Sequence, residues 1–158
     1  SCEKGLADAI AYGVIAGFPV VDVKITVYDG TFHEVDSSDI AFKIAASRAF
    51  KDAMNNAKPV LLEPIMKVKV TVPDRFMGDV NSDLNQRRGR ILGVDVANGM
   101  QVITAEVPLA EMFRYSSELR SMTAGSGTFE MSHSKYEIVP SHIAEKVKSD
   151  AVQEKEET

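Results

Sequence analysis

The dipeptide Asn98-Gly99 separates two β-rich runs, residues 90–97 and residues 100–107. Asparagine followed by glycine tolerates the positive φ angles of a two-residue hairpin turn better than most other pairs do. The two runs are therefore predicted to form an antiparallel hairpin. Because a hairpin fixes two neighbouring strands, it limits the folds that the flanking residues can complete.

A strand and a helix are predicted before the hairpin. Apolar and polar side chains alternate from Met66 to Val72, which is typical of a half-buried strand, and Pro73 ends it. Gly89 supplies the stop signal of a short amphipathic helix that precedes the hairpin. The apolar residues of this helix recur at helical spacing: Met77, Val80 and Leu84.

A second helix and a last strand are predicted after the hairpin. Pro108 suits the first turn of a helix. The apolar face of that helix is formed by Met112, Tyr115, Leu119 and Met122. Residues 128–139 then predict a strand that ends at Pro140. The order strand, helix, two strands, helix, strand is that of a ferredoxin-like βαββαβ domain, in which two helices cover one face of a four-stranded antiparallel sheet. We therefore expect an α+β protein with this domain at residues 64–140.

Residues 1–63 predict a smaller set of elements. Residues 6–11 predict a helix that ends near Gly13 or Gly17. Strict alternation of apolar and polar side chains over residues 21–27 predicts a strand. That strand would form one side of a second hairpin.

A turn at Asp29-Gly30 and a longer helix complete the first region. The helix is predicted to be capped by Asp36, Ser37 or Ser38 and to end at Asn55-Asn56. Its buried stripe is expected to contain Ile40, Ile44, Phe50, Ala53 and Met54. Two helices and a hairpin give a thin core, so residues 1–63 are expected to be part of a domain.

The C-terminal segment, residues 141–158, is predicted to start as a helix and to finish in a charged tail. Residues 153–158 carry no apolar anchor, so we expect the acidic tail to be solvated and disordered.

The composition excludes several classes of protein. The formal net charge is −5, and residues 64–140 carry equal numbers of basic and acidic side chains, so a polyanion could be bound only by a local basic patch. The single cysteine, Cys2, forms no intrachain disulfide and indicates a cytoplasmic setting. No apolar run approaches the length of a membrane span and no signal peptide starts at Ser1. Neither a membrane nor DNA is expected as a partner.

The sequence also lacks the motifs of the common catalytic sites. It contains no phosphate loop, no Gly-x-Ser-x-Gly elbow, no His-Glu-x-x-His helix and no Cys/His cluster at metal-ligand spacing. We therefore predict no catalytic residue, no metal and no cofactor for this chain.

Three groups of residues are candidates for binding. The first is the arginine cluster of Arg87, Arg88 and Arg90, whose guanidinium groups could donate forked hydrogen bonds to RNA phosphates. Their spacing alone favours a simpler interpretation, a helix C-terminus at which positive charges interact favourably with the helix dipole. His33 follows a predicted turn and could stack on an RNA base. The simpler interpretation is that His33 is a polar surface residue without a functional role.

The third candidate is the small-residue loop after the second helix. It contains Ser121 and continues through Ala124, Gly125, Ser126 and Gly127. Such a loop allows backbone N–H groups to approach a phosphate closely, and the alternative is a flexible turn.

Several segments, in order, resemble the elongation factor G family. They include residues 18–24, the run Tyr28-Asp29-Gly30-Thr31-Phe32-His33-Glu34-Val35-Asp36-Ser37-Ser38, and residues 59–66. Further segments are Met77-Gly78-Asp79-Val80, Arg87-Arg88-Gly89-Arg90-Ile91, residues 107–113 and Leu119-Arg120-Ser121-Met122-Thr123. The resemblance runs from about residue 3 to Pro140.

The resemblance implies that residues 1–63 are the later half of domain IV, a partial βαβ-type (ribosomal protein S5 domain 2-like) fold, and that residues 64–140 are domain V. The GTPase domain, with its GTP and Mg²⁺, would then belong to the missing part of a longer parent protein. In that family the domain IV tip reaches the decoding centre. The resemblance places Asp29, Gly30, Phe32, His33 and Glu34 in this tip loop, beside transfer RNA and messenger RNA.

Domain V of the family lies near the sarcin-ricin loop and the stalk base of the ribosome. The loop after its second helix is on the RNA side, and Ser121 matches a contact position. Ala124 and Ser126 replace the usual Gln and Arg of this loop. This departure leaves open a paralogue that acts in ribosome recycling. A ferredoxin-like binding module that does not act in translation is a further alternative. Separately, copies of the chain could exchange strands at the exposed sheet edge expected in residues 1–63.

Overall fold

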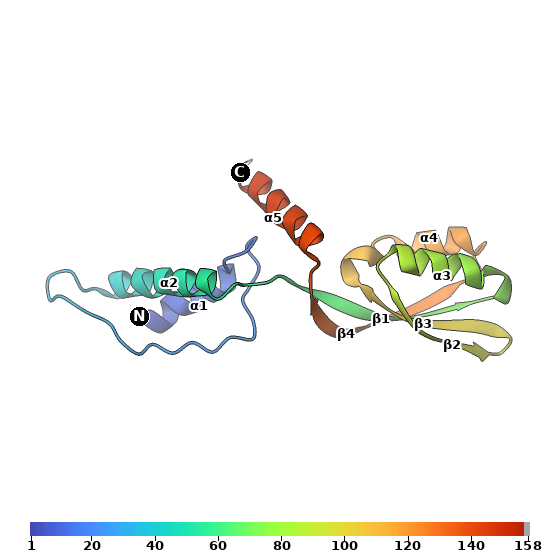
Figure 1. The fold of residues 1–158 in the computed structure, drawn as a ribbon, viewed down its shortest axis with the longest axis horizontal. Helices are drawn as coiled ribbons and strands as arrows, with labels where there is room; N and C mark the ends of the chain where they lie inside the picture. Colours follow the sequence, from blue (N-terminus) through green and yellow to red (C-terminus); the bar gives the residue numbers. More distant parts are fainter. Residues whose placement is uncertain (157–158) are drawn as a thin grey trace. The chain divides into compact units, whose positions relative to one another are not determined.

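The computed structural model describes residues 1–156 and contains two compact units. One unit consists of residues Leu62–Ile138, and the other combines residues Ser1–Leu61 with the C-terminal segment that begins at Val139. Figure 1 shows the elements of each unit.

The Leu62–Ile138 unit contains a four-stranded antiparallel sheet. Its strands are β1 (Leu62–Val72), β2 (Arg90–Ala97), β3 (Met100–Pro108) and β4 (Thr128–Ile138), in the order β2-β3-β1-β4. This order and the antiparallel pairing confirm the predicted ferredoxin-like fold. At the turn between β2 and β3, Asn98 has φ 53° and Gly99 has φ 75°, as a two-residue hairpin turn of this type requires.

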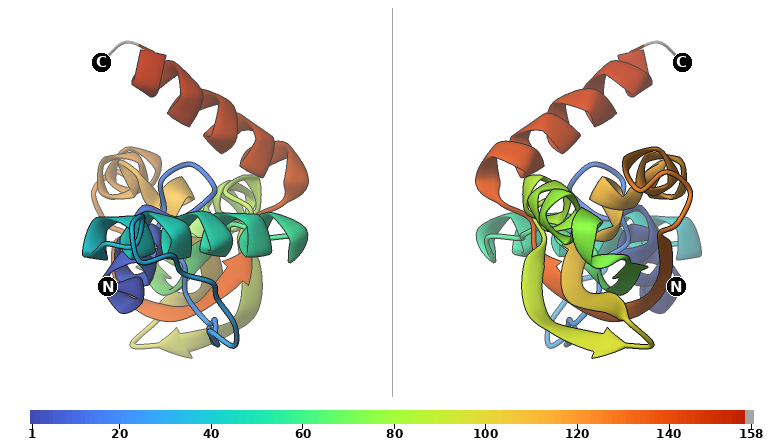
Figure 2. Two further views of the ribbon diagram at one scale, coloured as in Figure 1. Left: turned by 90° about the vertical axis from the view of Figure 1, so that its left-hand side faces the viewer. Right: turned by 90° about the vertical axis from the view of Figure 1, so that its right-hand side faces the viewer.

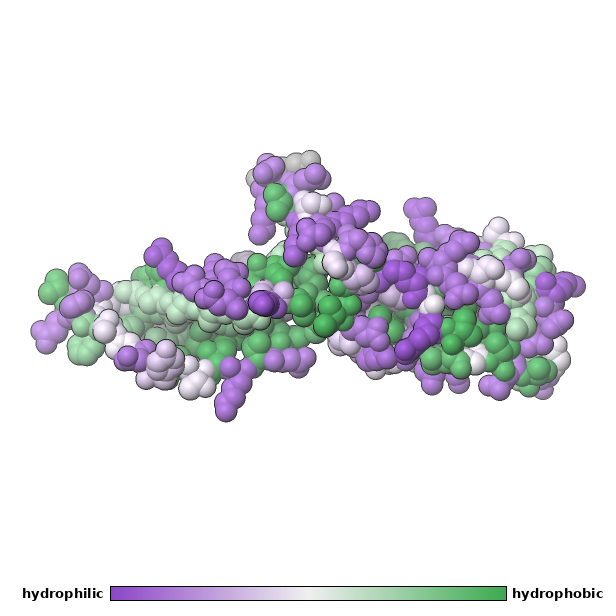
Figure 3. All heavy atoms as spheres, in the orientation of Figure 1, coloured by the Kyte–Doolittle hydropathy of each residue, from purple (hydrophilic) through white to green (hydrophobic). Residues whose placement is uncertain are grey.

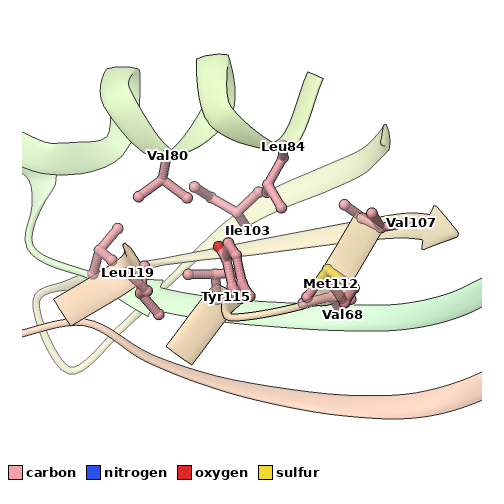
Figure 4. Packing of buried hydrophobic residues seen from close by; sticks show 11 residues of the cluster. Val68, Val80, Leu84, Ile103, Val107, Met112, Tyr115 and Leu119 are labelled. Atoms are coloured by element: carbon pink, nitrogen blue, oxygen red, sulfur yellow. The ribbon is translucent and has the colours of Figure 1, made fainter. Parts of the chain in front are cut away.

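Two helices cover one face of the sheet, as Figure 2 shows from both ends. α3 (Met77–Gln86) follows a short 3-10 turn, η1 (Asp74–Phe76), and α4 (Tyr115–Met122) precedes β4. Between these helices and the sheet lies the core shown in Figure 4, where Val80 and Leu84 of α3 point toward Tyr115 and Ile103. The predicted apolar residues of α3 therefore form the contact between helix and sheet.

The second predicted helix is interrupted. The sequence predicts one helix from Pro108, whereas the structure has a 3-10 helix, η2 (Leu109–Met112), and then α4, with Arg114 at φ 58° between them. The break allows η2 to contact β1 and β3 while α4 contacts β4 and α3. Met112 and Tyr115 are both buried as a result, so the apolar residues are those predicted but the helix is shorter.

Gly89 ends α3 by a mechanism that differs from the predicted one. Arg88 adopts the left-handed conformation, at φ 58°, and the Gly89 N–H donates to the Leu84 carbonyl at 2.9 Å. A Cβ at Gly89 would lie 2.4 Å from that carbonyl oxygen. Glycine is needed here for the close approach of two backbone segments rather than for a positive φ.

The other unit contains two helices in contact, α1 (Cys2–Tyr12) and α2 (Asp39–Asn56). The two helices predicted in residues 1–63 are therefore both present. Gly13 follows α1 at φ 63°, and the Ser38 side chain caps α2 by accepting the Ala41 N–H at 3.1 Å. The predicted buried stripe of α2 is wrong in part, because Phe50 is buried but Ile40 is 70% exposed and Ile44 is 48% exposed. Ala53 is exposed as well and Met54 is half-buried, so only part of the predicted stripe is covered.

The strand predicted at residues 21–27 is wrong. The segment is without regular secondary structure, and residues 18–35 form an irregular connection between the two helices (Figure 1). A strand requires a hydrogen-bonding partner, and residues 1–156 provide none for this segment. Alternation of side chains indicates a tendency to form a strand but does not supply the second strand.

α5 (Ser141–Glu156) extends farther than predicted. The sequence predicts a disordered tail from Gln153, but helical structure continues to Glu156 because glutamate and lysine are good helix formers. Residues 157 and 158 of the predicted tail lie outside the described residues. Among residues 1–156, no helix is both long and apolar enough to cross a membrane.

Candidate nucleic-acid interface

The loop that follows α4 is organised by Thr123, whose side chain is completely buried. Its Oγ1 donates to the Leu119 carbonyl at 2.6 Å and accepts the Gly127 N–H at 2.9 Å. The hydroxyl thus uses both its donor and its acceptor capacity and closes the loop between α4 and β4. A Cβ on Gly127 would lie 2.8 Å from Thr123 Oγ1, so the position favours glycine.

The remaining loop residues are also held by internal hydrogen bonds. The Gly125 N–H donates to the Arg120 carbonyl at 2.8 Å, and the Ser126 N–H and Oγ donate to the Thr123 carbonyl at 3.0 Å and 2.5 Å. The backbone N–H groups of Gly125, Ser126 and Gly127 are therefore already engaged and do not form the phosphate cradle that the sequence suggests. These internal hydrogen bonds instead hold the loop in one shape, in which Ala124 and Gly125 are exposed and have positive φ angles.

Ser121 and Arg120 flank this loop at the exposed side of α4. Arg120 is not among the predicted binding residues, although it lies off the apolar stripe of the helix, which indicates a solvent-facing position. Within residues 1–156, no carboxylate forms an ion pair with its guanidinium. Arg120 is thus a cation beside the loop that is available for a phosphate.

Arg87 is engaged within the protein. Its guanidinium donates to Asp83 at 2.8 Å, to the Glu111 carbonyl at 2.6 Å and to Glu118, and it lies 4.9 Å from the centre of the Tyr115 ring. The side chain is 11% exposed. Burial acts to lower the pKa of Arg87, but the hydrogen bond and the charge of Asp83, together with Glu118, raise it. These contacts connect α3 to η2 and α4.

Arg88 forms a second set of ion pairs. It donates to both carboxylate oxygens of Glu63, at 2.7 Å and 3.0 Å, and to Glu111 at 3.1 Å. The hydrogen bonds to Glu63 raise the pKa of the Arg88 guanidinium despite its partial burial. This bidentate geometry ties the end of α3 to the start of β1.

Arg90 pairs with Glu106 on the neighbouring strand, and Glu106 also pairs with Lys135 of β4 at 3.3 Å. Hydrogen bonding by Arg90 holds the pKa of Glu106 below its usual value. All three arginines of the predicted patch thus have carboxylate partners. The geometry favours the structural alternative for Arg87 and Arg88, and a phosphate would have to displace these carboxylates.

His33 lies in a tight turn just before α2. The backbone N–H of His33 donates to Ser37 Oγ at 3.0 Å, and its backbone carbonyl accepts the N–H groups of Asp36 and Ser37. Asp29 Oδ1 accepts the N–H of the next residue, Gly30, at 2.8 Å, but the turn predicted at these two residues is wrong, because the turn lies at residues 34–36 instead. The His33 ring, Phe32 and Glu34 are exposed, so this loop presents an aromatic ring, an imidazole and a carboxylate to solvent.

Residues 1–156 contain no group of three or more His, Cys, Asp or Glu side chains that could hold a metal ion. Cys2 lies with its sulfur 4.0 Å from the Phe42 carbonyl, between α1 and α2.

Comparison with protein families identifies both parts of the chain. The family model for the elongation factor G C-terminus matches residues 60–147, and the model for elongation factor G, domain IV, matches residues 1–58. Elongation factor G of Aquifex pyrophilus is 56% identical over 147 residues, which are 93% of this chain and 21% of that protein. The chain thus spans about a fifth of that relative's length.

A solved structure is also similar. A crystal structure of a protein from Thermus thermophilus superposes with a TM-score of 0.83 at 49% identity. The match covers 96% of this chain and 23% of the Thermus chain.

Proposed function

The chain belongs to the elongation factor G family, and on this basis we propose that it is the ribosome-contacting arm of a translocation factor. The observation that supports this most strongly is the match of two family models in sequence order, over residues 1–58 and residues 60–147. Residues 1–63 would be the later half of domain IV, and residues 64–140 would be domain V. Residues 141–158 would be a C-terminal helix followed by an acidic tail.

The proposed mechanism is mechanical. Domain V would anchor near the sarcin-ricin loop and the stalk base, while the domain IV tip enters the decoding centre behind the transfer RNA and prevents it from slipping back with the messenger RNA. The ion pairs of Arg87 and Arg88 join α3 to β1, η2 and α4, and such cross-links suit a domain that transmits force without deforming.

Two surfaces would contact RNA in this arrangement. In domain V the loop formed by Ser121 and residues 124–127, which internal hydrogen bonds hold in one shape, would fit the shape of the RNA. Arg120 would supply a positive charge beside it. In domain IV the exposed loop at Asp29, Gly30 and residues 32–34 would bring His33 to the transfer RNA. An imidazole near neutral pH can stack and donate a hydrogen bond at a small charge cost.

The chemistry of GTP hydrolysis would reside outside this chain. The parent protein would carry GTP and Mg²⁺ in another domain and act in the cytoplasm. This division agrees with the absence from the sequence of a phosphate loop and of a nucleophile with its base.

A His33→Ala variant of the full-length factor tests the proposed role of the tip. We expect slower single-turnover translocation at an unchanged rate of GTP hydrolysis. A His142→Ala variant is the matched control, since that histidine lies in α5. Equal translocation rates in His33→Ala and in the unaltered factor would remove His33 from the mechanism.

A second candidate function is ribosome recycling by a paralogue of the main factor. Ala124 and Ser126 favour it, because neither side chain reproduces the amide and guanidinium that the family usually carries in this loop. Subunit-splitting assays with ribosome recycling factor, compared with translocation assays on the same protein, distinguish the two functions.

A further inference from the structure

Arg75 is an exposed cation at the same end of the Leu62–Ile138 unit as the loop that follows α4. It lies in η1, directly after β1, and the loop leads directly into β4. β1 and β4 are paired, with Thr71 near the end of β1 opposite Thr128 at the start of β4. The strand register therefore brings η1 and the loop to neighbouring strand ends, at the right-hand end of this unit in Figure 1.

The loop itself carries no positive charge. Residues 122–128 contain no charged side chain, and the N–H groups of residues 125–127 are engaged within the protein. A phosphate at this loop must therefore be held by cations from outside it. We propose that Arg75 binds a backbone phosphate of the RNA that lies against the loop, so that η1 and Arg120 together supply its charge. This inference rests on the proposed function, which places RNA at the loop.

The guanidinium of Arg75 is without a carboxylate partner. Within residues 1–156 this side chain forms no ion pair. The adjacent carboxylate of Asp74 instead accepts a hydrogen bond from Gln101 Nε2 of β3 at 2.9 Å. The three arginines of the predicted patch each have a carboxylate partner, so Arg75 differs from them because it can bind a phosphate without displacing one.

Phe76 holds the Arg75 side chain in place. The guanidinium carbon lies 4.8 Å from the centre of the Phe76 ring, and Phe76 is packed against the buried core. This contact uses the face of the guanidinium and leaves the N–H groups at its edge available to phosphate oxygens. A side chain already held against a ring loses less conformational freedom on binding, so the entropic cost of binding is lower.

The backbone that carries Arg75 is held by hydrogen bonds on both sides. The Phe76 N–H donates to the Pro73 carbonyl at 3.0 Å, and the Met77 N–H donates to the Asp74 carbonyl. The link from Gln101 to Asp74 connects the same turn to β3. η1 thus presents its cation from a fixed position beside the loop.

The surroundings of Arg75 suit an RNA backbone better than a protein surface. Ser121, Thr128 and Asn98 are exposed at the same end of the unit. Hydroxyl and amide groups such as these donate hydrogen bonds to phosphate and sugar oxygens. In the view of Figure 3, hydrophilic atoms (purple) interrupt hydrophobic ones (green) at this end. A mixed surface is typical of nucleic-acid contacts, whereas the centre of a protein interface is mostly apolar.

The salt dependence of binding tests the proposal. Binding of the whole chain to isolated large ribosomal subunits is measured over a range of potassium chloride concentrations. Neutralisation of an RNA phosphate releases condensed cations, so the slope of log affinity against log salt reports the number of phosphates bound. Arg75→Ala should weaken binding about tenfold at low salt and reduce this slope by about one.

Three further variants sharpen the comparison. Arg75→Lys keeps the charge and should keep the slope, and the double variant Arg75→Ala, Arg120→Ala should reduce the slope by about two. Arg114→Asn is the matched control. Arg114 is exposed at the other end of α4, where it forms no ion pair within the described residues, and asparagine tolerates its φ of 58°. This variant should leave affinity and slope nearly unchanged.

Two results would overturn the proposal. An unchanged slope in Arg75→Ala excludes a phosphate, and a lower affinity at that unchanged slope would assign Arg75 to a ribosomal protein instead. Equal effects of Arg75→Ala and Arg114→Asn would show a general effect of net charge. If the unaltered chain does not bind the subunits at all, the proposed function fails together with this inference. A slope that responds to Arg120→Ala but not to Arg75→Ala overturns this inference alone.

Discussion

The side-chain oxygen of Thr123 accepts the backbone N–H of Gly127 at 2.9 Å and sets the shape of the loop between them. Thr123 is fully buried, whereas Ala124 and Gly125 are exposed. A single interior hydroxyl therefore controls a surface loop that carries no large side chain of its own. The loop conformation depends on this hydrogen bond and on the close fit of Gly127 against Thr123.

Replacement of Thr123 by valine should destabilise the chain by about 1–3 kcal/mol, because the Gly127 N–H loses its acceptor in a buried place. Chemical unfolding followed by circular dichroism measures the loss, and amide exchange at Gly127 should accelerate. Thr123→Ser keeps the hydroxyl and should retain most of the stability. Equal stability of the valine and serine variants would show that the hydroxyl is unimportant.

Replacement of Gly89 by alanine should be strongly destabilising. The new methyl would lie 2.4 Å from the Leu84 carbonyl oxygen and 3.1 Å from a methyl of Val107, so the end of α3 must move away from β3. We expect a loss of about 1–3 kcal/mol in the free energy of unfolding. Gly93→Ala is the matched control, because a Cβ there meets no atom within 4 Å. Similar losses in both variants would contradict the proposed close contact.

Arg88→Ala should cost more stability than Arg90→Ala. Removal of Arg88 leaves the Glu63 carboxylate, whose side chain is 12% exposed, without its bidentate partner. We expect a loss of about 1–3 kcal/mol for Arg88→Ala, and at most about 1 kcal/mol for the solvent-exposed Arg90. The same unfolding measurement compares them, and the reverse order would show that the Glu63 pair is not the main link between α3 and β1.

The pairing of Glu106 predicts a dependence of stability on pH. Arg90 and Lys135 lower the pKa of Glu106 in the folded chain, so this carboxylate contributes stability at a pH above the ordinary pKa of glutamate. The contribution should disappear as the pH falls through the lowered pKa of the folded state. Glu106→Gln should therefore be less stable than the unaltered chain at neutral pH, and the difference should shrink in acid. A difference that is constant with pH would contradict this role.

Most of the Leu62–Ile138 unit could be predicted from the residues alone because the signals there are local. Asn98-Gly99 defines a turn through the φ angles of two adjacent residues, and the alternation from Met66 to Val72 places one face of β1 in the core. The partners of these elements lie within the same unit, so local preference and tertiary packing agree. The family resemblance was also visible in the residues alone.

Features that depend on a partner residue elsewhere in the chain could not be predicted in this way. Residues 21–27 alternate as a strand does, but alternation cannot provide the second strand, and the segment remains unpaired in residues 1–156. The arginines of 87–90 look like a basic patch in sequence, yet Glu63, Glu106 and Glu118 are distant in the chain and become their neighbours only on folding. Local backbone preferences act between adjacent residues, whereas hydrogen-bond and ion-pair partners are chosen by the fold.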